Sequence, residues 1–544
     1  MRRRFTTLIA ASLAIALFSA SALTANASEK TDAAVTESAE NFAPEVEQSV
    51  SPVRFEMANK YICDQGTDQD GNITSTYSSL AFPRVSLTKE CARMYPELDK
   101  SMNAFFDQLE KEKKEQYKQL KMDARELHEK DKTSSPDQSQ QLPEFKDHTT
   151  ADVVLADGTA VSIRLTTEYY GGGPHDYVLR QGVTFDTKTG KQLAFRDVVT
   201  DTDNAAALVF QKLKAQYPEL QPYYSQENVA KAFAAEEDEM FAWTMEPDGV
   251  KVFFNSGVLG TEAEGSQEVK IAFYDNTDLF NKEYFVIPPK WILPIDTDTD
   301  VKINLGNGET SIRVEDPETE NEGGLKNTRV FVINGQKQEL KHENLVYYTS
   351  TPYLVNVDGK QWIWCFDQSD DDVVTLFVYG LENGKVTYTG FHEDLGLRTA
   401  DKDWDGEGSG HKVYPLTDPD SMQLSERINA LGTYGGYKTY KVSENGTPVT
   451  EDVMYTPNSN IEVVTKVNHE FQMVGKDGQA AEMKEYPAGT KCRIRATDKK
   501  SVVELEMNGD ASQIARVTID MGQYPHMVDN MEETALFDGI FYAG

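Results

Sequence analysis

Apolar side chains recur at two different spacings along this chain, one typical of helices and the other of strands. Leu98, Met102, Phe105 and Leu109 lie three or four positions apart, which places them on one face of a helix. We therefore predict a long helix over 96–130. The charged residues between these positions are typical of a solvent-facing helix surface.

Alternating apolar and polar positions predict strands elsewhere in the first half of the chain. One long alternating run turns at Asp157 and Gly158, a dipeptide typical of hairpins, and a second hairpin turns at 247–249. Two further helices are predicted over 205–217 and 227–235. Strands with helices packed on them predict an α+β fold, with an antiparallel N-terminal sheet covered by helices.

The pattern after position 295 is almost entirely one of short strands. Four of them follow closely around the turn signals Asp358-Gly359 and Asn383-Gly384. The block over 434–520 has the strand lengths and turn spacing of a small barrel. We expect mostly-β C-terminal modules, with an SH3-like barrel as the candidate for the last one.

These changes of pattern divide the chain into six segments. The predicted segments are a signal peptide at 1–27, a flexible leader at 28–51, a small α+β domain with the long helix at 52–146, a second α+β domain at 147–295, a β-rich domain at 296–425 and a small β domain at 426–544.

The first residues have the layout of a secretory signal. Basic residues at Arg2–Arg4 precede a short apolar run at Leu8–Phe18, and Ala25-Asn26-Ala27 fits a cleavage site before Ser28. No segment has the ~20 apolar residues that span a bilayer. We expect an exported protein without a transmembrane anchor after cleavage, located outside the cell, in a periplasm or on the cell surface.

Acidic side chains outnumber basic ones. The chain has 89 Asp and Glu against 54 Lys and Arg, a formal net charge of −35. Such a charge repels phosphate backbones and anionic lipids, which argues against nucleic acid as a partner. Metal ions and basic proteins are the partners that this charge favours.

The chain has four cysteines, at Cys63, Cys91, Cys365 and Cys492, and no Cys-x-x-Cys motif. An exported protein can form disulfides, and four cysteines allow three pairings that the sequence does not distinguish. We favour Cys63–Cys91 and Cys365–Cys492, because each of these pairs lies within one half of the chain.

No motif of a familiar enzyme class is present. The eight histidines never fall in the His-Glu-x-x-His spacing of zinc proteases, and the chain has neither a Gly-x-Ser-x-Gly elbow nor a nucleotide-binding glycine loop. We therefore predict no catalytic residue and no cofactor other than a candidate calcium ion.

The stretch DKDWDGEGSGHK has the ligand spacing of a calcium loop. Asp401, Asp403 and Asp405 alternate ahead of a glycine, as oxygen ligands do in the first half of an EF-hand, and Ser409 stands at the ninth position. Lys412 replaces the glutamate that usually completes the site. Calcium binding and a plain acidic surface loop both remain open.

The stretch EYYGGGPHDY, at 168–177, combines three glycines with a proline and a histidine. At least one glycine is expected to adopt a positive φ, and Pro174 keeps its neighbour out of the helical region. His175 would then be held beside Tyr170 and Tyr177. It would either contact a ligand, as the candidate binding residue with these tyrosines, or hydrogen-bond to the backbone.

The order of motifs over about 147–288 resembles the extracellular domain shared by RsiV-type anti-sigma factors and the N-terminal part of PdaC-type peptidoglycan deacetylases. YYGGGPHDY is followed by VTFDTKTGK, by LAFRDVV and by a hairpin leading to EVKI, in the order of that family. The resemblance implies an α+β domain of the cell envelope. In the anti-sigma factors, such a domain is a receptor for lysozyme, a strongly basic protein.

Three functional hypotheses follow. The first is an exported, non-catalytic cell-envelope protein that binds cell-wall glycan or a basic protein such as lysozyme. The second is an envelope-modifying hydrolase whose site has no recognised motif. The third is a structural surface protein attached through its C-terminal β modules.

Thermal melting tests the calcium interpretation. A cation that binds only the folded chain raises its melting temperature, so melting should occur at a higher temperature with calcium than with a chelator. Identical melting temperatures under the two conditions would exclude calcium binding.

Overall fold

The computed structural model describes residues 45–46, 52–67, 70, 72–134, 142–220, 225–234, 241–317, 325–341, 345–369, 373–401, 409–476 and 478–543. Over these residues the chain forms two compact units. Unit 1 comprises Met1–Leu293, Lys302–Ser311 and Trp404–Gly410, and unit 2 comprises Pro294–Val301, Ile312–Asp403 and His411–Gly544.

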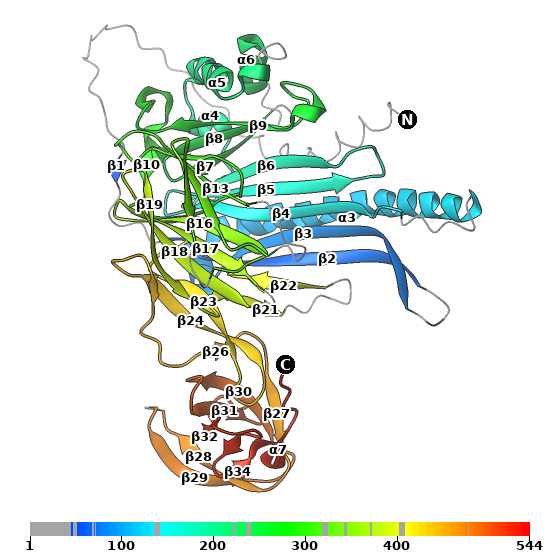
Figure 1. Cartoon of the computed structure of the whole chain (residues 1–544), viewed down its shortest axis with the longest axis vertical. Coiled ribbons are helices and arrows are strands. Elements are labelled where there is room, and N and C mark those ends of the chain that lie inside the picture. The colour runs from blue at the N-terminus through cyan, green and yellow to red at the C-terminus, as the bar shows by residue number, and fades with distance from the viewer. Residues whose placement is uncertain are drawn as a thin grey trace, which may run out of the picture. The chain divides into compact units, whose positions relative to one another are not determined.

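The first sheet of unit 1 carries a long helix along one face (Figure 1). Five of its seven strands follow one another in the order β2 (Phe55–Thr67), β3 (Ile73–Leu87), β4 (Phe145–Ala156), β5 (Ala160–Tyr170) and β6 (Tyr177–Asp186). β3 and β4 are parallel, whereas the other neighbours are antiparallel. The sheet is therefore mixed, and the prediction of an antiparallel sheet is wrong.

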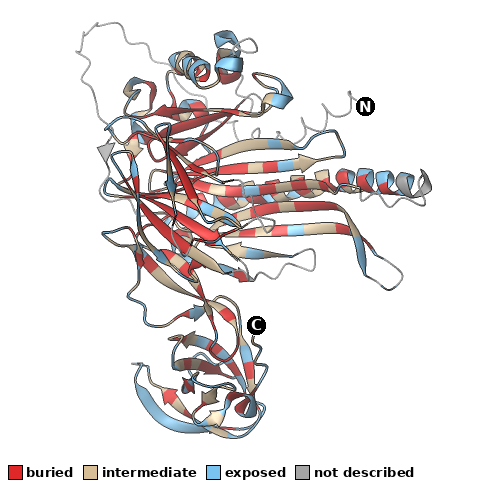
Figure 2. Ribbon diagram, in the orientation of Figure 1, coloured by how far each residue is buried: buried red, intermediate tan, exposed pale blue. Residues whose placement is uncertain are grey.

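Helix α3 (Pro96–Ser134) explains the parallel pair, because it connects β3 to β4. Parallel neighbours need a crossover of a dozen residues or more, and a helix is the usual one. The predicted helix is confirmed, with Leu98, Met102 and Leu109 buried. Phe106 is fully buried beside the half-buried Phe105. Figure 2 shows buried and exposed residues alternating along α3, as expected for a helix with one covered face.

A buried ion pair attaches the middle of α3 to the sheet. The ammonium group of Lys113 donates a hydrogen bond of 2.7 Å to Asp147 on β4 and one of 3.4 Å to the Thr167 hydroxyl on β5. The Thr149 and Thr167 hydroxyls are 2.7 Å apart, and all four residues are buried. The ion pair and these hydrogen bonds therefore replace the water molecules that both charged groups lose on burial.

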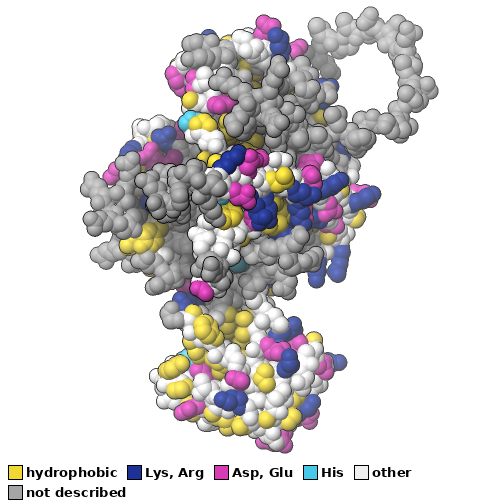
Figure 3. Space-filling model, turned by 90° about the vertical axis from the view of Figure 1, so that its right-hand side faces the viewer, with side chains coloured by type: hydrophobic (Ala, Val, Ile, Leu, Met, Phe, Trp, Pro, Cys, Tyr) yellow, Lys and Arg dark blue, Asp and Glu magenta, His cyan; other side chains and the backbone are white. Residues whose placement is uncertain are grey.

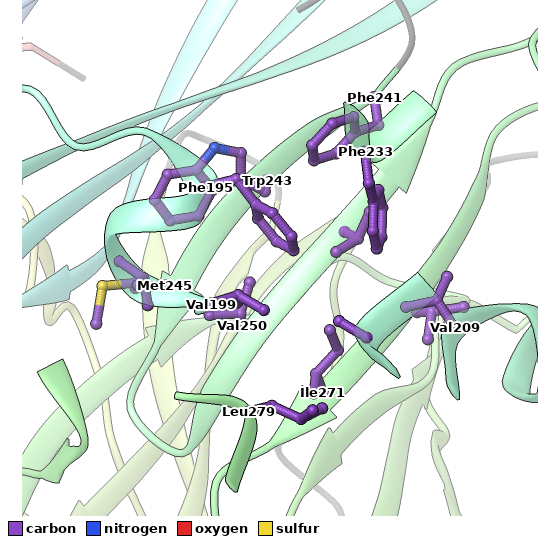
Figure 4. Packing of buried hydrophobic residues seen from close by; sticks show 14 of the residues in the cluster. Phe195, Val199, Val209, Phe233, Phe241, Trp243, Met245, Val250, Ile271 and Leu279 are labelled. Carbon is purple, nitrogen blue, oxygen red and sulfur yellow. The ribbon is translucent and has the colours of Figure 1, made fainter. Parts of the chain in front are cut away.

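A second sheet in unit 1 has the order β7 (Ala242–Glu246), β8 (Gly249–Phe254) and β9 (Gln267–Ala272). The predicted hairpin at 247–249 joins β7 to β8. Helices α5 (Thr202–Gln216) and α6 (Gln226–Ala234) supply buried residues to the same core. In Figure 4 the ring of Phe195 lies edge-on to Trp243 and Phe241, at centroid distances of 5.8 and 5.2 Å.

The remaining elements that begin before position 316 are short, and a further short strand begins at Ser409. They are β1 (Glu45–Val46), α2 (Lys89–Met94), α4 (Phe195–Val198), η2 (Pro218–Leu220), η3 (Glu262–Glu264), η4 (Thr277–Leu279), η5 (Lys282–Tyr284), β10 (Val286–Ile287), β11 (Lys290–Pro294), β12 (Val301–Ile303), β13 (Thr310–Glu315) and β22 (Ser409–Val413).

Unit 2 consists almost entirely of strands. The predicted group of four is an antiparallel meander of β16 (Thr349–Val357), β17 (Lys360–Gln368), β18 (Val374–Glu382) and β19 (Lys385–His392). Its other strands before position 460 are β14 (Arg329–Ile333), β15 (Gln336–Leu340), β20 (Gly396–Leu397), β21 (Thr399–Asp401), β23 (Met422–Ile428), β24 (Tyr434–Val442), β25 (Pro448–Val449) and β26 (Thr456–Pro457).

The C-terminal sheet is open rather than closed. Among the described strands, its order runs from β29 at one edge to β35 at the other, and these two edges do not pair. An SH3-like barrel is therefore not formed. Its elements are β27 (Glu462–Thr465), β28 (His469–Val474), β29 (Ala480–Tyr486), β30 (Lys491–Thr497), β31 (Val502–Met507), β32 (Ile514–Asp520), β33 (Met527–Val528), β34 (Met531–Glu532), α7 (Glu533–Leu536) and β35 (Phe537–Asp538).

The predicted α+β class is wrong, because the fold is mostly β. Helices longer than two turns are confined to α3, α5 and α6 in unit 1, while the described part of unit 2 contributes only the four-residue α7. The predicted boundary at 146/147 falls inside β4, so the segments on both sides of it build one sheet. The predicted helices are formed, but strands account for most of the regular structure.

The buried pair predicts a large effect of a single substitution. Asp147→Ala would leave the Lys113 ammonium buried without its carboxylate, so we expect the free energy of unfolding to fall by about 3 kcal/mol in urea titrations. The double variant Lys113→Met/Asp147→Leu should recover much of this loss.

Asp107→Ala is the matched control for that experiment. Asp107 pairs with Arg84, and its side chain is 68% exposed. Its loss should cost less than about 1 kcal/mol. Equal effects of the two alanine variants would show that the Lys113–Asp147 pair contributes no more than a surface ion pair.

Candidate functional site

The glycine-rich stretch forms the connection between β5 and β6, at one end of the first sheet. Gly172 has φ 80°, and a Cβ atom there would overlap the ring of Phe145. Only glycine avoids both the strain and the overlap. The expectation that at least one of these glycines has a positive φ is therefore confirmed.

The three candidate binding residues of this stretch lie in different surroundings. His175 is exposed and has no hydrogen-bond partner among the described residues. The Tyr170 ring lies edge-on to Phe145, with centroids 5.8 Å apart. Tyr177 begins β6 opposite Tyr169. Of the two interpretations of His175, the structure thus favours an imidazole open to solvent over one bonded to its own backbone.

One row of side chains crosses five strands of the first sheet beside this loop. The strand registers align Tyr61, Ala81, His148, Glu168 and Val178, one from each of β2 to β6, and we call these five residues the His148 row.

The His148 row lies on the sheet face opposite α3. Side chains alternate along a strand, and the neighbours Asp147 and Thr149 lie on the α3 side, so His148 points away from the helix. Tyr61 is 36% exposed and Val178 is 42% exposed, and Glu168 is also exposed. The row is therefore accessible to a partner.

Carboxylates outnumber the ammonium group at this end of the sheet. Lys146 lies 3.2 Å from Asp176 and 3.3 Å from Glu168, whose side chains are each 56% exposed. The Asp176 carboxylate, together with Glu168, raises the pKa of Lys146. A third carboxylate, that of Glu144, acts electrostatically on both His148 and Tyr61. Two carboxylates thus lie beside Lys146, and a third acts on its neighbour His148.

His148 forms a hydrogen bond with a serine that solvent does not reach. Its Nε2 atom lies 2.7 Å from the Ser79 hydroxyl, and Ser79 is fully buried. Burial lowers the pKa of His148 below its ordinary value of 6.5, so the imidazole is neutral at pH 7. The Tyr61 ring stands edge-on at 5.9 Å. A serine nucleophile must be accessible to its substrate, so this pair does not form a hydrolase site.

The candidate calcium ligands are only partly described. Asp403 and Asp405 lie outside the described residues. The backbone of Asp401 ends β21, and the exposed Ser409 begins β22. Within the described part of the chain, no group of three or more His, Cys, Asp or Glu side chains is arranged to hold a metal ion.

All four cysteines are free, so neither predicted disulfide is formed. Cys63 is half-buried on β2 and Cys91 is buried in α2, while Cys365 on β17 and Cys492 on β30 are buried in unit 2. Burial raises the pKa of both Cys365 and Cys492 to about 12, so these thiols stay protonated and unreactive. Within the described residues no helix is both long and apolar enough to cross a bilayer.

The sequence alone does not reveal the His148 row. The hairpin turn at Asp157-Gly158 is a partial signal, because counting outward from the turn pairs the residues of the two strands. Uninterrupted pairing across a two-residue turn would place His148 opposite Thr167, which lies on the α3 face. A longer turn and a register shift between Val153 and Leu155 bring Glu168 opposite His148 instead. A bulge of this kind is hard to recognise in one sequence.

No family model matches this chain, and no curated protein matches it. Two solved structures are similar to part of it. A member of the DUF3298 family (BF2082) from Bacteroides fragilis NCTC 9343 has 16% sequence identity and a TM-score of 0.32, over 42% of this chain and 94% of the other. A DUF3298 family protein (PA4972) from Pseudomonas aeruginosa PAO1 has 14% identity and a TM-score of 0.25, over 42% and 96%. DUF3298 is the family of the RsiV- and PdaC-type domains.

Proposed function

We propose that this chain is an exported, non-catalytic binding protein of the cell envelope, and that the sheet face around the His148 row binds a basic protein. The observation that carries the proposal is the excess of carboxylates there. Glu168 and Asp176 both lie beside the ammonium group of Lys146, and Glu144 acts electrostatically on His148. A lysine or arginine of a partner can pair with a carboxylate that Lys146 does not neutralise.

The same face offers apolar contact area between its charges. Tyr61 and Val178 are both more than one-third exposed, at opposite ends of the His148 row. Protein interfaces are enriched in aromatic side chains, which bury a large area with little loss of conformational freedom. A flat sheet surface with these two residues among carboxylates therefore suits a folded protein better than a small ion.

The overall charge supports the choice of a basic partner. The formal net charge of −35 attracts a cationic protein over long distances and accelerates its association. On the face drawn in Figure 3, however, acidic and basic side chains are interspersed. Long-range attraction alone would therefore not orient the partner, and the carboxylates beside the His148 row would supply the specific contacts.

Charge reversal at this face tests the proposal. The double variant Glu168→Lys/Asp176→Lys should bind hen egg-white lysozyme, used as the basic probe, at least about tenfold more weakly at low ionic strength. Added salt should reduce the difference, because exposed charges are screened. Titration calorimetry on the full mature chain measures both effects.

Glu482→Lys/Glu485→Lys is the matched control. Both residues are exposed on the edge strand β29, and the variant changes the net charge by the same amount. It should retain lysozyme binding. The proposal fails if wild type does not bind the probe, or if the two double variants weaken binding equally, since only net charge would then matter.

The pKa of His148 predicts a pH dependence. Burial keeps this pKa below 6.5, so the neutral imidazole predominates down to that pH. Protonation adds a positive charge among the carboxylates, so affinity for the basic probe should fall severalfold as the pH is lowered below 6.5. His148→Gln should lose this step while retaining affinity at pH 7. An unchanged pH profile in the variant would assign the step to another group.

A further inference from the structure

A cluster of aromatic rings lies at the C-terminal end of unit 2. The Tyr542 ring stands edge-on to His526 and to Tyr524, with centroids 5.3 and 6.0 Å apart. Tyr524 is also edge-on to His526, at 6.0 Å. Tyr524 is 74% exposed, although aromatic side chains are normally covered in a folded protein. Nothing in the fold of the described residues requires this exposure.

A buried carboxylate organises the polar side of the cluster. Glu533 is fully buried, and its Oε2 atom accepts a hydrogen bond of 2.7 Å from the Tyr542 hydroxyl. Its Oε1 atom accepts the backbone N–H of His526 at 3.2 Å. Both carboxylate oxygens therefore have donors, which a buried charge requires.

These hydrogen bonds orient the His526 ring. The Tyr542 hydroxyl donates its only proton to Glu533, so it can only accept the bond from His526 Nδ1, at 3.0 Å. Nδ1 also lies 3.5 Å from Glu533 Oε2. Nε2 has no hydrogen-bond partner among the described residues. The chain of bonds from Glu533 through Tyr542 thus leaves Nε2 available for a hydrogen bond beside the exposed Tyr524 ring.

The segment that carries Tyr542 is attached at several points. The Thr433 N–H donates to the Phe541 carbonyl at 2.8 Å, and the Arg427 guanidinium donates to the Ala543 carbonyl, also at 2.8 Å. These bonds hold the Tyr542 ring in place before any ligand arrives. A prearranged site loses less conformational entropy on binding.

We propose that Tyr524, His526 and Tyr542 form a carbohydrate-binding site for a neutral pyranose ring. The negative face of an aromatic ring attracts the C–H groups on one side of a sugar, and the Tyr524 ring is exposed enough to be stacked upon. The Nε2 atom of His526 can form a hydrogen bond with a sugar hydroxyl, which both donates and accepts. Aromatic stacking together with a directed polar contact is the usual composition of a small-ligand site.

The polar groups favour a neutral sugar over a cationic side chain. An aromatic cage for a lysine or arginine gains from an accessible carboxylate, but here the Glu533 carboxylate is buried and both of its oxygens are occupied. This site lies in unit 2 and goes beyond the basic-protein site proposed for unit 1.

Titration calorimetry of the full mature chain with a soluble hexamer of β-1,4-linked N-acetylglucosamine tests the site. Wild type should bind the hexamer, and Tyr524→Ala should weaken binding at least about tenfold, as expected for the loss of a stacked aromatic anchor. His526→Ala should also weaken binding, because it removes the Nε2 atom that forms a hydrogen bond with the sugar.

Phe541→Ala is the matched control. Phe541 is 74% exposed, like Tyr524, but has no ring contact with the cluster. It should bind the hexamer as wild type does. Glu168→Lys/Asp176→Lys should also retain hexamer binding, which separates this site from the one for a basic protein.

Three results would overturn the proposal. They are the absence of hexamer binding by wild type, equal losses in Tyr524→Ala and Phe541→Ala, and binding of a lysine hexapeptide at this site in place of the sugar. Circular dichroism spectra that match wild type would show that the variants are folded.

Discussion

The crossover of α3 between two parallel strands is the constraint on which unit 1 depends. A helix of 39 residues covers one face of the first sheet and requires β3 and β4 to run in the same direction. That face is largely apolar, and its buried polar groups, such as Lys113 and Asp147, are paired. Strand β7 packs on the opposite face near Ser162 and Gly182, so a partner can bind that face only at the end that carries the His148 row.

Because side chains alternate along β4, this strand contributes residues both to the buried face under α3 and to the proposed binding surface. Asp147 points under α3, while its neighbours Lys146 and His148 point to the other face. Three consecutive polar residues therefore have two different roles. Asp147 balances a buried charge and contributes to stability, whereas Lys146 and His148 set the electrostatics of an exposed surface.

The two proposed sites use ionisable groups in opposite ways. Around the His148 row, exposed carboxylates such as Glu168 and Asp176 remain available to a cationic partner. In the C-terminal cluster, the carboxylate of Glu533 is buried, and it orients His526 through Tyr542. The first surface would thus select a partner protein by its charge, and the second would select a sugar by its shape and hydrogen-bonding groups. An envelope protein with both would connect a protein ligand with a glycan.

The sequence by itself determined the local elements. Helix α3, the hairpins and the positive φ of Gly172 follow from periodicity and from the stereochemistry of single residues. Only the tertiary structure decided the parallel pairing of β3 with β4, the register that brings Glu168 opposite His148, and the assembly of the Tyr542 cluster. These features depend on contacts between residues that are distant in sequence, or on a single bulge that moves every side chain beyond it to the opposite face.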